Sequence, residues 1–233
     1  ENQKKERNAV VTKLKAQEKA LSKEIATKKK RDKQLQNQIA AIVRREIEKA
    51  KKEAEKKAKE AEVKTPNPST TTTPATTTTT TKPEVKRSYL DLNADDVKLN
   101  EKFELNKGKL PWPVDKGIVT IPFGTSKVDE LMIDNPGITI STPSAGIPVK
   151  AIFEGEVSAV SNLGDSWMVM IRHGKYFSVY SNLGSVSVSK GAKVSNQQVI
   201  GTAGRADDGS GGQVSLILMN ESKNFNPTPW LRR

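Results

Sequence analysis

Few residues in this chain could hold a metal ion or carry out catalysis. Its 233 residues include one histidine, His173, and no cysteine. A catalytic zinc ion takes about three nitrogen, sulfur or carboxylate ligands and keeps one position open for water. A single histidine cannot supply that set, and the carboxylates of Asp129, Glu130 and Asp134 lack the spacing of a calcium or magnesium cage. The residue types therefore predict no metal ion, no other cofactor and no catalytic residue.

Two other patterns give weaker signals. His173 stands in His173-Gly174-Lys175, a turn signal between two apolar runs, which favours a structural role over that of a base for Ser215. The glycine-rich loop at residues 207–212 precedes a predicted strand, whereas a phosphate-binding loop would need a helix after it. Neither pattern predicts an active site.

Residues 1–64 are predicted to form a long coiled-coil helix. They contain no Gly or Pro, and 21 Lys and Arg stand against 11 Asp and Glu. The lysines are interleaved with glutamates and no aromatic residue is present, which favours a solvated helix surface over nucleic-acid binding. A stripe of apolar residues needs a partner helix, from the same protein or another molecule. Its members recur mostly three, four or seven positions apart, at Val10, Leu14, Leu21, Ile25, Leu35, Ile39, Ile42, Val43 and Ile47.

Two further segments separate this helix from the rest. Residues 65–83 are a Thr-rich stretch with four prolines, predicted to be a flexible tether. Residues 84–108 form an arm in which Asn93 reads as an N-cap and Gly108 as a helix stop. The helix between them, 93–107, would place Val97, Leu99 and Phe103 on one apolar face.

Residues 109–233 read as an all-β domain, so the fold class is a helical arm followed by an antiparallel β-sandwich or open barrel. Short apolar runs alternate with Gly, Asn, Ser and Pro every 8–12 positions. Two hairpins are predicted, one around Glu154-Gly155 and one around His173-Gly174-Lys175. Further strands are expected at residues 117–123, 137–140, 186–188, 199–203 and 214–219.

Four stretches of the β region resemble the LytM (lysostaphin-like, peptidase family M23) zinc endopeptidases. They are GKLPWPV from Gly108, GIPVKAIFEGEVSAV, MIRHGKYFSVYSNLGSVSVSKGAKVSNQQVIGTAG and NPTPWL near the C-terminus. Together with the coiled coil and tether, they most resemble the EnvC-type murein hydrolase activators. The resemblance implies the LytM fold over nearly all of residues 108–231.

Active members of that family bind zinc through an H-x-G-x-D pattern and the second His of an H-x-H strand, and a Y-x-H segment assists catalysis. The matching positions here carry neutral residues, which implies a binding groove that has lost its metal. These positions are Asn135, Thr139, Asn182, Gln213 and Ser215. Leu131, Met132 and Ile133 are expected either to form an apolar wall of that groove or to be core residues of a strand.

The EnvC resemblance implies a mechanism. Such proteins activate periplasmic N-acetylmuramoyl-L-alanine amidases by binding the helix that plugs the amidase active site. In relatives the coiled coil docks onto an FtsEX-like membrane complex, and a helix beside the LytM domain covers the groove until it is released. Here the helix of Val97, Leu99 and Phe103 is the candidate cover. The resemblance thus predicts an exported, periplasmic protein and a fragment without its signal peptide, with an amidase, an FtsEX-like complex and peptidoglycan as partners.

Two alternatives stay open at this point. One is an active zinc metalloendopeptidase with an unusual site that cleaves peptidoglycan cross-links. The other is a structural module whose β domain binds peptidoglycan while the coiled coil sets its reach. Only the family resemblance favours the activator over the structural module.

Overall fold

The computed structural model describes the β region almost completely and the N-terminal region in part, at residues 15, 19, 22, 26, 27, 30, 33–49, 52, 94–128, 131–206 and 209–233. The chain divides into two compact units, Glu1–Ala41 and Ile42–Arg233. Residues 33–49 are helical, as predicted, and none of the helices in these ranges is long and apolar enough to cross a membrane. The tether at residues 65–83 lies outside the described residues, and the coiled-coil pairing stays a prediction.

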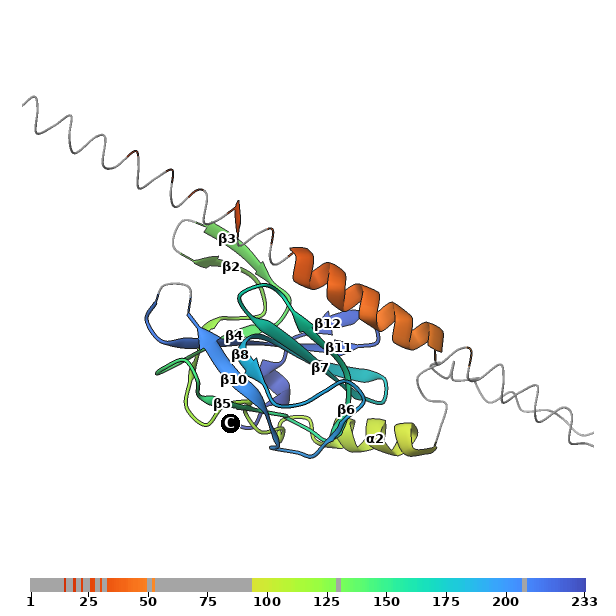
Figure 1. Cartoon of the computed structure of the whole chain (residues 1–233). Coiled ribbons are helices and arrows are strands. Elements are labelled where there is room, and N and C mark those ends of the chain that lie inside the picture. The colour runs from red at the N-terminus through yellow and green to blue at the C-terminus, as the bar shows by residue number, and fades with distance from the viewer. Residues whose placement is uncertain are drawn as a thin grey trace, which may run out of the picture. The chain divides into compact units, whose positions relative to one another are not determined.

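The β domain is built on one branched antiparallel sheet of ten strands (Figure 1). Its main path runs β1-β4-β11-β10-β8-β7-β6-β9, while β12 pairs with β11 and β5 with β10. A separate two-stranded ribbon consists of β2 and β3. The strands are β1 Ile118–Ile121, β2 Gly124–Val128, β3 Leu131–Asn135, β4 Ile138–Thr142, β5 Pro148–Lys150, β6 Gly155–Asn162, β7 Trp167–His173, β8 Tyr176–Val186, β9 Lys193–Val194, β10 Val199–Arg205, β11 Gly212–Asn220 and β12 Lys223–Phe225.

The antiparallel β architecture expected from the sequence is confirmed, but only one of the two predicted hairpins is. β7 and β8 pair from His173 opposite Tyr176 onward, around a Gly174 with φ +75°. The Glu154-Gly155 hairpin is wrong, because β5 pairs with β10 and β6 pairs with β7 and β9. Gly155 serves close packing instead: a Cβ there would lie 2.7 Å from Nδ1 of His173.

Alternate residues of the central strands fill the hydrophobic core on one face of the sheet. On β11 these are Val214, Leu216 and Leu218, all fully buried. Ile138 and Ile140 of β4 and Tyr180 of β8 belong to the same core. The opposite face of these strands, called here the outer face, carries the residues that alternate with the core residues along each strand.

The two ends of the β domain are joined along the GKLPWPV stretch. Gly108 and Leu110 donate backbone hydrogen bonds to the carbonyl of Trp230, and Arg232 donates one to the carbonyl of Leu110. The indole of Trp112 donates to the carbonyl of Arg232 at 2.8 Å. The first and last segments of the domain therefore close on each other, and a helix α2, Ala94–Leu105, leads directly into this closure.

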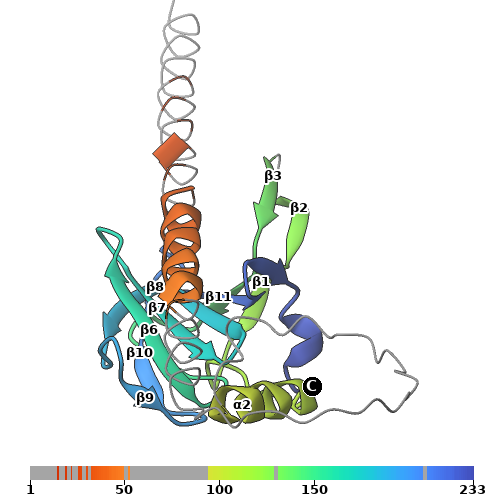
Figure 2. The ribbon, with the colours of Figure 1, turned by 90° about the vertical axis from the view of Figure 1, so that its right-hand side faces the viewer.

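Both views place α2 at one end of the β domain and the β2–β3 ribbon at the other (Figure 1, Figure 2). The helix ends in a turn at residues 106–109, where Gly108 has φ +78°. Gly108 was predicted as the helix stop from its ability to take this left-handed conformation.

Candidate functional site

A row of small hydroxyl side chains crosses three strands on the outer face. Thr139 of β4 lies directly opposite Ser215 of β11, and Ser215 lies directly opposite Ser181 of β8. Directly paired residues of antiparallel strands place their side chains on the same face. Thr139, Ser215 and Ser181 are called the polar row below. The structure thus brings together two of the predicted site residues, Thr139 and Ser215, with Ser181, which sequence reasoning missed.

Asn135 is fixed beside this row by a tight turn between β3 and β4. Its side-chain amide donates to the hydroxyl of Thr139 at 3.3 Å and to the carbonyl of Ile121 at 3.1 Å. Its carbonyl oxygen accepts the backbone N–H of Gly137, an Asx-type turn. Gly137 allows this turn to pass close to β11, because a Cβ there would lie 2.1 Å from the carbonyl oxygen of Leu216.

Asn182 marks the point where β8 changes partner. Up to Ser181 the strand pairs with β11, and from Leu183 onward it pairs with β10. Asn182 has φ +58°, a left-handed conformation that asparagine tolerates better than most residues. Its amide donates to the carbonyls of Gln213 at 3.1 Å and Arg205 at 3.3 Å, one on each of the diverging strands. The amide therefore satisfies backbone acceptors at the branch of the sheet.

The outer face becomes apolar beyond the polar row. Val179 of β8 pairs with Ile217 of β11 on one side and with Met170 of β7 on the other. These three residues, called the apolar row, are buried in the structure although they are not part of the core cluster. The alternation along β11, with Gln213, Ser215 and Ile217 on one face, was the signal available in the sequence. The apolar row was missed because the alternation identifies a row across the sheet only when the neighbouring strands are known.

Comparison with known proteins identifies the fold. Residues 134–227 match the family model described as peptidase family M23. The β domain is an M23 (LytM-like) domain. The match begins one residue before Asn135 and contains the whole polar row, so the positions that resemble zinc-ligand positions lie inside the part of the chain that matches the family.

Two curated relatives are similar to part of this chain. The uncharacterized protein NMB1333 of Neisseria meningitidis is 33% identical over 132 residues, which are 56% of this chain and 21% of that protein. An uncharacterized protein of Haemophilus influenzae is 36% identical over 91 residues, 38% of this chain and 22% of that protein. The aligned part of this chain therefore spans about a fifth of the length of either relative. Among solved structures, the SpoIIQ–SpoIIIAH pore forming complex contains a chain that is 21% identical, with a TM-score of 0.47, covering 54% of this chain and 92% of that one.

The β2–β3 ribbon of the M23 domain carries the residues predicted as a groove wall or as strand core. The side chain of Met132 is 66% exposed and that of Ile133 is partly exposed, and neither belongs to the core cluster. Successive residues of a strand point to opposite faces, so Met132 and Ile133 cannot both line one wall. Leu131 begins β3, and the wall role of this ribbon stays a prediction.

The contacts of α2 correct the expectation that Val97, Leu99 and Phe103 form a groove cover. Phe103 is fully buried in the core of the M23 domain, where it stacks on His173 and Tyr176 at ring distances of 5.2 and 4.8 Å. Leu99 packs against the same core, while Val97 is 38% exposed. Tyr176 lies opposite Asn220 on β11, five residues from Ser215, so α2 is held at the far end of β8 from the polar row.

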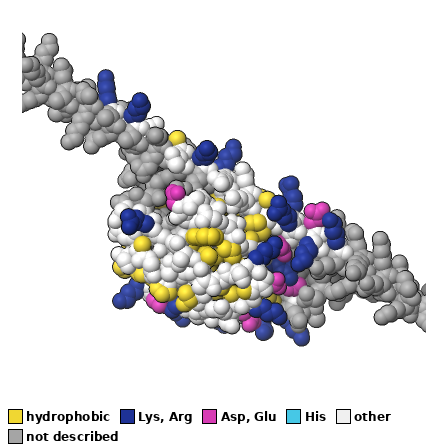
Figure 3. All heavy atoms as spheres, in the orientation of Figure 1, with side chains coloured by type: hydrophobic (Ala, Val, Ile, Leu, Met, Phe, Trp, Pro, Cys, Tyr) yellow, Lys and Arg dark blue, Asp and Glu magenta, His cyan; other side chains and the backbone are white. Residues whose placement is uncertain are grey.

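Polar contacts fasten α2 to the β7–β8 turn. Arg172 donates two hydrogen bonds of 3.0 Å to the carboxylate of Asp96, and the backbone N–H of Lys175 donates to Oδ1 of Asn100 at 2.6 Å. The hydroxyl of Tyr176 donates to Glu104 at 2.8 Å. Burial raises the pKa of Glu104, but hydrogen bonds from Tyr176 and Lys175 outweigh it, and its pKa lies below the usual value. Basic and acidic side chains accordingly lie next to each other on this side of the surface (Figure 3).

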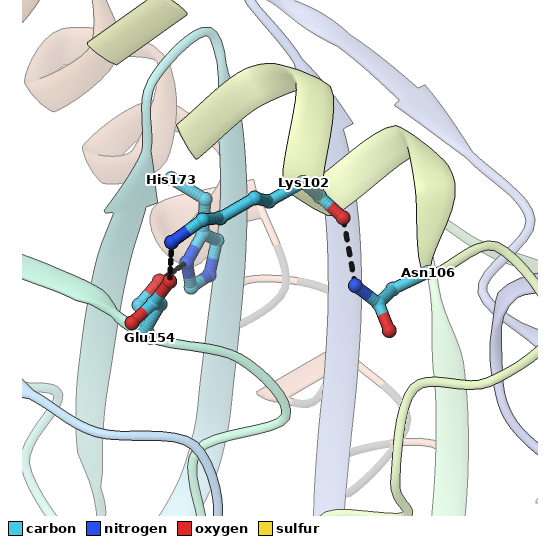
Figure 4. A network of polar contacts seen from close by, with 4 residues as sticks. All are labelled: Lys102, Asn106, Glu154 and His173. Carbon is cyan, nitrogen blue, oxygen red and sulfur yellow. Dashed lines mark hydrogen bonds and ion pairs between the residues drawn. The ribbon is translucent and has the colours of Figure 1, made fainter. Parts of the chain in front are cut away.

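His173, the single histidine, is buried beneath α2 (Figure 4). Its Nδ1 lies 2.6 Å from the carbonyl oxygen of Glu154, and its Nε2 lies 2.8 Å from the hydroxyl of Ser178. Burial lowers the pKa of His173 to about 4, against a smaller opposing effect of the Glu154 hydrogen bond. Both ring nitrogens are therefore used inside the fold, which agrees with the structural role predicted for this residue. Within the described ranges, no group of three or more His, Cys, Asp or Glu side chains could hold a metal ion.

Proposed function

We propose that this chain is a non-catalytic activator of a periplasmic N-acetylmuramoyl-L-alanine amidase. The supporting observation is the chemistry of the positions that resemble zinc-ligand positions of active M23 enzymes. Asn135, Thr139 and Ser215 offer amide and hydroxyl groups, and Asn135 and Thr139 bond to each other. Zinc binding needs several imidazole, thiolate or carboxylate ligands, and the only imidazole in the chain is engaged at both nitrogens elsewhere.

The outer face suits an amphipathic helix as its ligand. In the uncharged polar row Ser215 is partly exposed while Thr139 and Ser181 are buried, so Ser215 is the member that can exchange hydrogen bonds with a polar side chain of the ligand. The adjacent apolar row can receive an apolar stripe. Met170, Val179 and Ile217 are shielded from solvent in this structure, so a ligand reaches them only after they are uncovered. This requirement fits an activator that is switched on by a second event.

The N-terminal helix is assigned to the same proposal. Residues 33–49 are helical and carry the apolar positions Leu35, Ile39, Ile42, Val43 and Ile47. In the proposal this helix belongs to a coiled coil that receives the activating signal from an FtsEX-like membrane complex. The protein is then exported to the periplasm, where both the amidase and peptidoglycan are present.

The test is stimulation of amidase activity by the intact chain. Each N-acetylmuramoyl-L-alanine amidase of the source organism is incubated with dye-labelled peptidoglycan, with and without the purified chain, and dye release is measured. Ser215→Tyr fills the centre of the polar row and is expected to reduce the stimulation at least about tenfold, which corresponds to about 1.4 kcal/mol of binding free energy. Ser185→Tyr, at an exposed serine of the same strand as Ser181, is the matched control and should leave stimulation unchanged.

Three results would contradict the proposal. Stoichiometric zinc together with chelator-sensitive cleavage of peptidoglycan cross-links would identify a metalloendopeptidase. Sedimentation with peptidoglycan without stimulation of any amidase would identify a structural module. Equal stimulation by the Ser215→Tyr and Ser185→Tyr proteins would show that the polar row does not contact the amidase.

A further inference from the structure

We propose that α2 is an acid-sensitive clasp: protonation of His173 loosens the hold of α2 on the β7–β8 turn while the sheet of the M23 domain stays folded. This inference does not depend on the activator function. It depends on the packing of one helix over one buried imidazole.

Phe103 provides the central contact of the clasp. Its ring stacks on the His173 ring with an interplanar angle of 19°, and Phe153, Tyr176 and Trp230 surround it at ring distances of 4.8 to 5.3 Å. The side chain of Phe103 thus closes one face of the imidazole against solvent. α2 has only 12 residues, and a helix of that length is marginal in water without tertiary contacts.

The hydrogen bonds of His173 are all satisfied when the ring is neutral. The carbonyl oxygen of Glu154 can only accept, so Nδ1 carries the hydrogen, and Nε2 accepts the hydroxyl hydrogen of Ser178. Ser178 is in turn bonded to the hydroxyl of Tyr180, which accepts the backbone N–H of Ile152 at 2.9 Å. In this buried series of hydrogen bonds, each donor has one acceptor.

A second ring proton disrupts this arrangement in two ways. The new N–H at Nε2 must donate to the hydroxyl oxygen of Ser178. The buried series of hydrogen bonds then contains one hydrogen more than it has acceptors. In addition, a positive charge stands in a fully buried site, where desolvation strongly disfavours it. Removing Phe103 from the ring would give the charged imidazole access to water.

The neighbouring charges do not supply a counter-ion for the ring. On α2, Asp96 is paired with Arg172 of β7, and Glu104 with Lys175 of the turn. Lys102 of α2 lies 3.4 Å from the carboxylate of Glu154, the residue whose backbone carbonyl bonds His173 (Figure 4). Tyr176 of β8 donates to Glu104. Each of these carboxylates already has a cationic partner, so protonation of His173 adds an uncompensated charge under the helix.

α2 is the element that can yield. His173 belongs to β7, whose residues are paired with β6 on one side and β8 on the other. The contacts that hold the helix are the packing of Phe103 and Leu99, the hydrogen bond to Asn100 and the ion pairs of the helix, and the predicted tether at residues 65–83 lies further toward the N-terminus. Lifting α2 therefore exposes the ring without breaking any pairing of the sheet.

Amide hydrogen exchange of the intact chain tests the clasp. With a His173 pKa of about 4 when α2 is closed and the usual 6.5 when it is open, the opening constant of α2 should rise about 30-fold between pH 7.5 and pH 5. After correction for intrinsic exchange rates, amides of α2 should lose protection by that factor. They should also exchange faster than the amides of β11 at both pH values, because β11 opens only when the sheet unfolds. Above pH 5 ordinary carboxylates remain ionised, so the change reports His173.

His173→Gln, which cannot take up a proton, should reduce the 30-fold change to about onefold, while Val97→Ala on the exposed side of α2 should retain it. Because His173 is the only histidine, the hydrogen on its Cε1 gives one NMR signal in the unmodified chain, and that signal should not titrate between pH 7.5 and pH 5. Equal protection of α2 and β11 at both pH values, unchanged α2 protection, or a native His173 signal that titrates near pH 6.5 would each overturn the proposal.

Discussion

Replacement of Phe103 by Ala distinguishes a core residue from a detachable cover. The side chain is fully buried, and four rings, those of Phe153, His173, Tyr176 and Trp230, lie within 5.3 Å of its centroid. Truncation of a buried Phe to Ala costs about 3–5 kcal/mol, since the transfer free energy is lost and a cavity remains. The lost ring pairs, each worth about 0.5–1.5 kcal/mol, are part of this cost and raise it above the lower end of that range. We therefore expect the free energy of unfolding to fall by about 4 kcal/mol.

Urea denaturation of the intact chain, followed by tryptophan fluorescence, measures this change. Trp230 is one of the rings around Phe103, so its emission reports the same region. Leu105→Ala is the matched control on the same helix: its side chain is 75% exposed, and its truncation should change the free energy of unfolding by less than about 0.5 kcal/mol. If Phe103→Ala costs no more than Leu105→Ala, α2 does not belong to the folded domain and the assignment of Phe103 to its core is refuted.

Three further predictions follow from the packing of this domain. The free energy of unfolding should fall by about 2 kcal/mol from pH 7.5 to pH 5. The reason is that His173 has a pKa of about 4 when folded and 6.5 when unfolded, so the unfolded state binds more protons in that pH range. Urea titrations of the native and His173→Gln proteins check this, and an equal loss in both would contradict it. Gly174→Ala should lower the melting temperature more than Gly164→Ala. Both glycines have positive φ, but of the two only Gly174 would bring a Cβ against another group, Oδ1 of Asn100 at 2.1 Å. Equal shifts in melting temperature would argue against the contact between α2 and the turn. Asn182→Ala should cost about 1–3 kcal/mol by leaving two backbone carbonyls without their donor at a left-handed residue, and a smaller cost in urea denaturation would show that water replaces the amide.

Local signals in the sequence were enough to predict the elements whose partners are near in the chain. The β7–β8 hairpin follows from Gly174, which takes positive φ, between two apolar runs, and α2 follows from its apolar spacing and its glycine stop. Glu154-Gly155 has the same local appearance but forms no hairpin, because the strands on its two sides pair with other strands, and Gly155 instead allows a close approach to His173. A glycine needed for conformation and one needed for packing space look alike in a single sequence.

The candidate site shows the same limit. The resemblance to a known family was sufficient to select Thr139 and Ser215, which the pairing of β4 with β11 places opposite each other. Ser181 and Val179 were missed, since their relation to β11 depends on pairing across more than 30 residues of chain. For Phe103, an apolar helix face is equally compatible with a core contact and with a removable cover, and only the position of the aromatic cluster separates the two.

The closure between the first and last segments of the β domain has a mechanical consequence. Tension that pulls α2 away from the β7–β8 turn reaches the sheet next by way of residues 108–110, which bond the C-terminal segment at Trp230 and Arg232. Leu110 and Leu231 run parallel at this point, so a pull on the arm loads their hydrogen bonds together, in shear, rather than one after another. The last residues of the chain therefore act as the anchor of the arm, and loss of the segment after Pro229 would weaken the attachment of α2 as well as the end of the sheet.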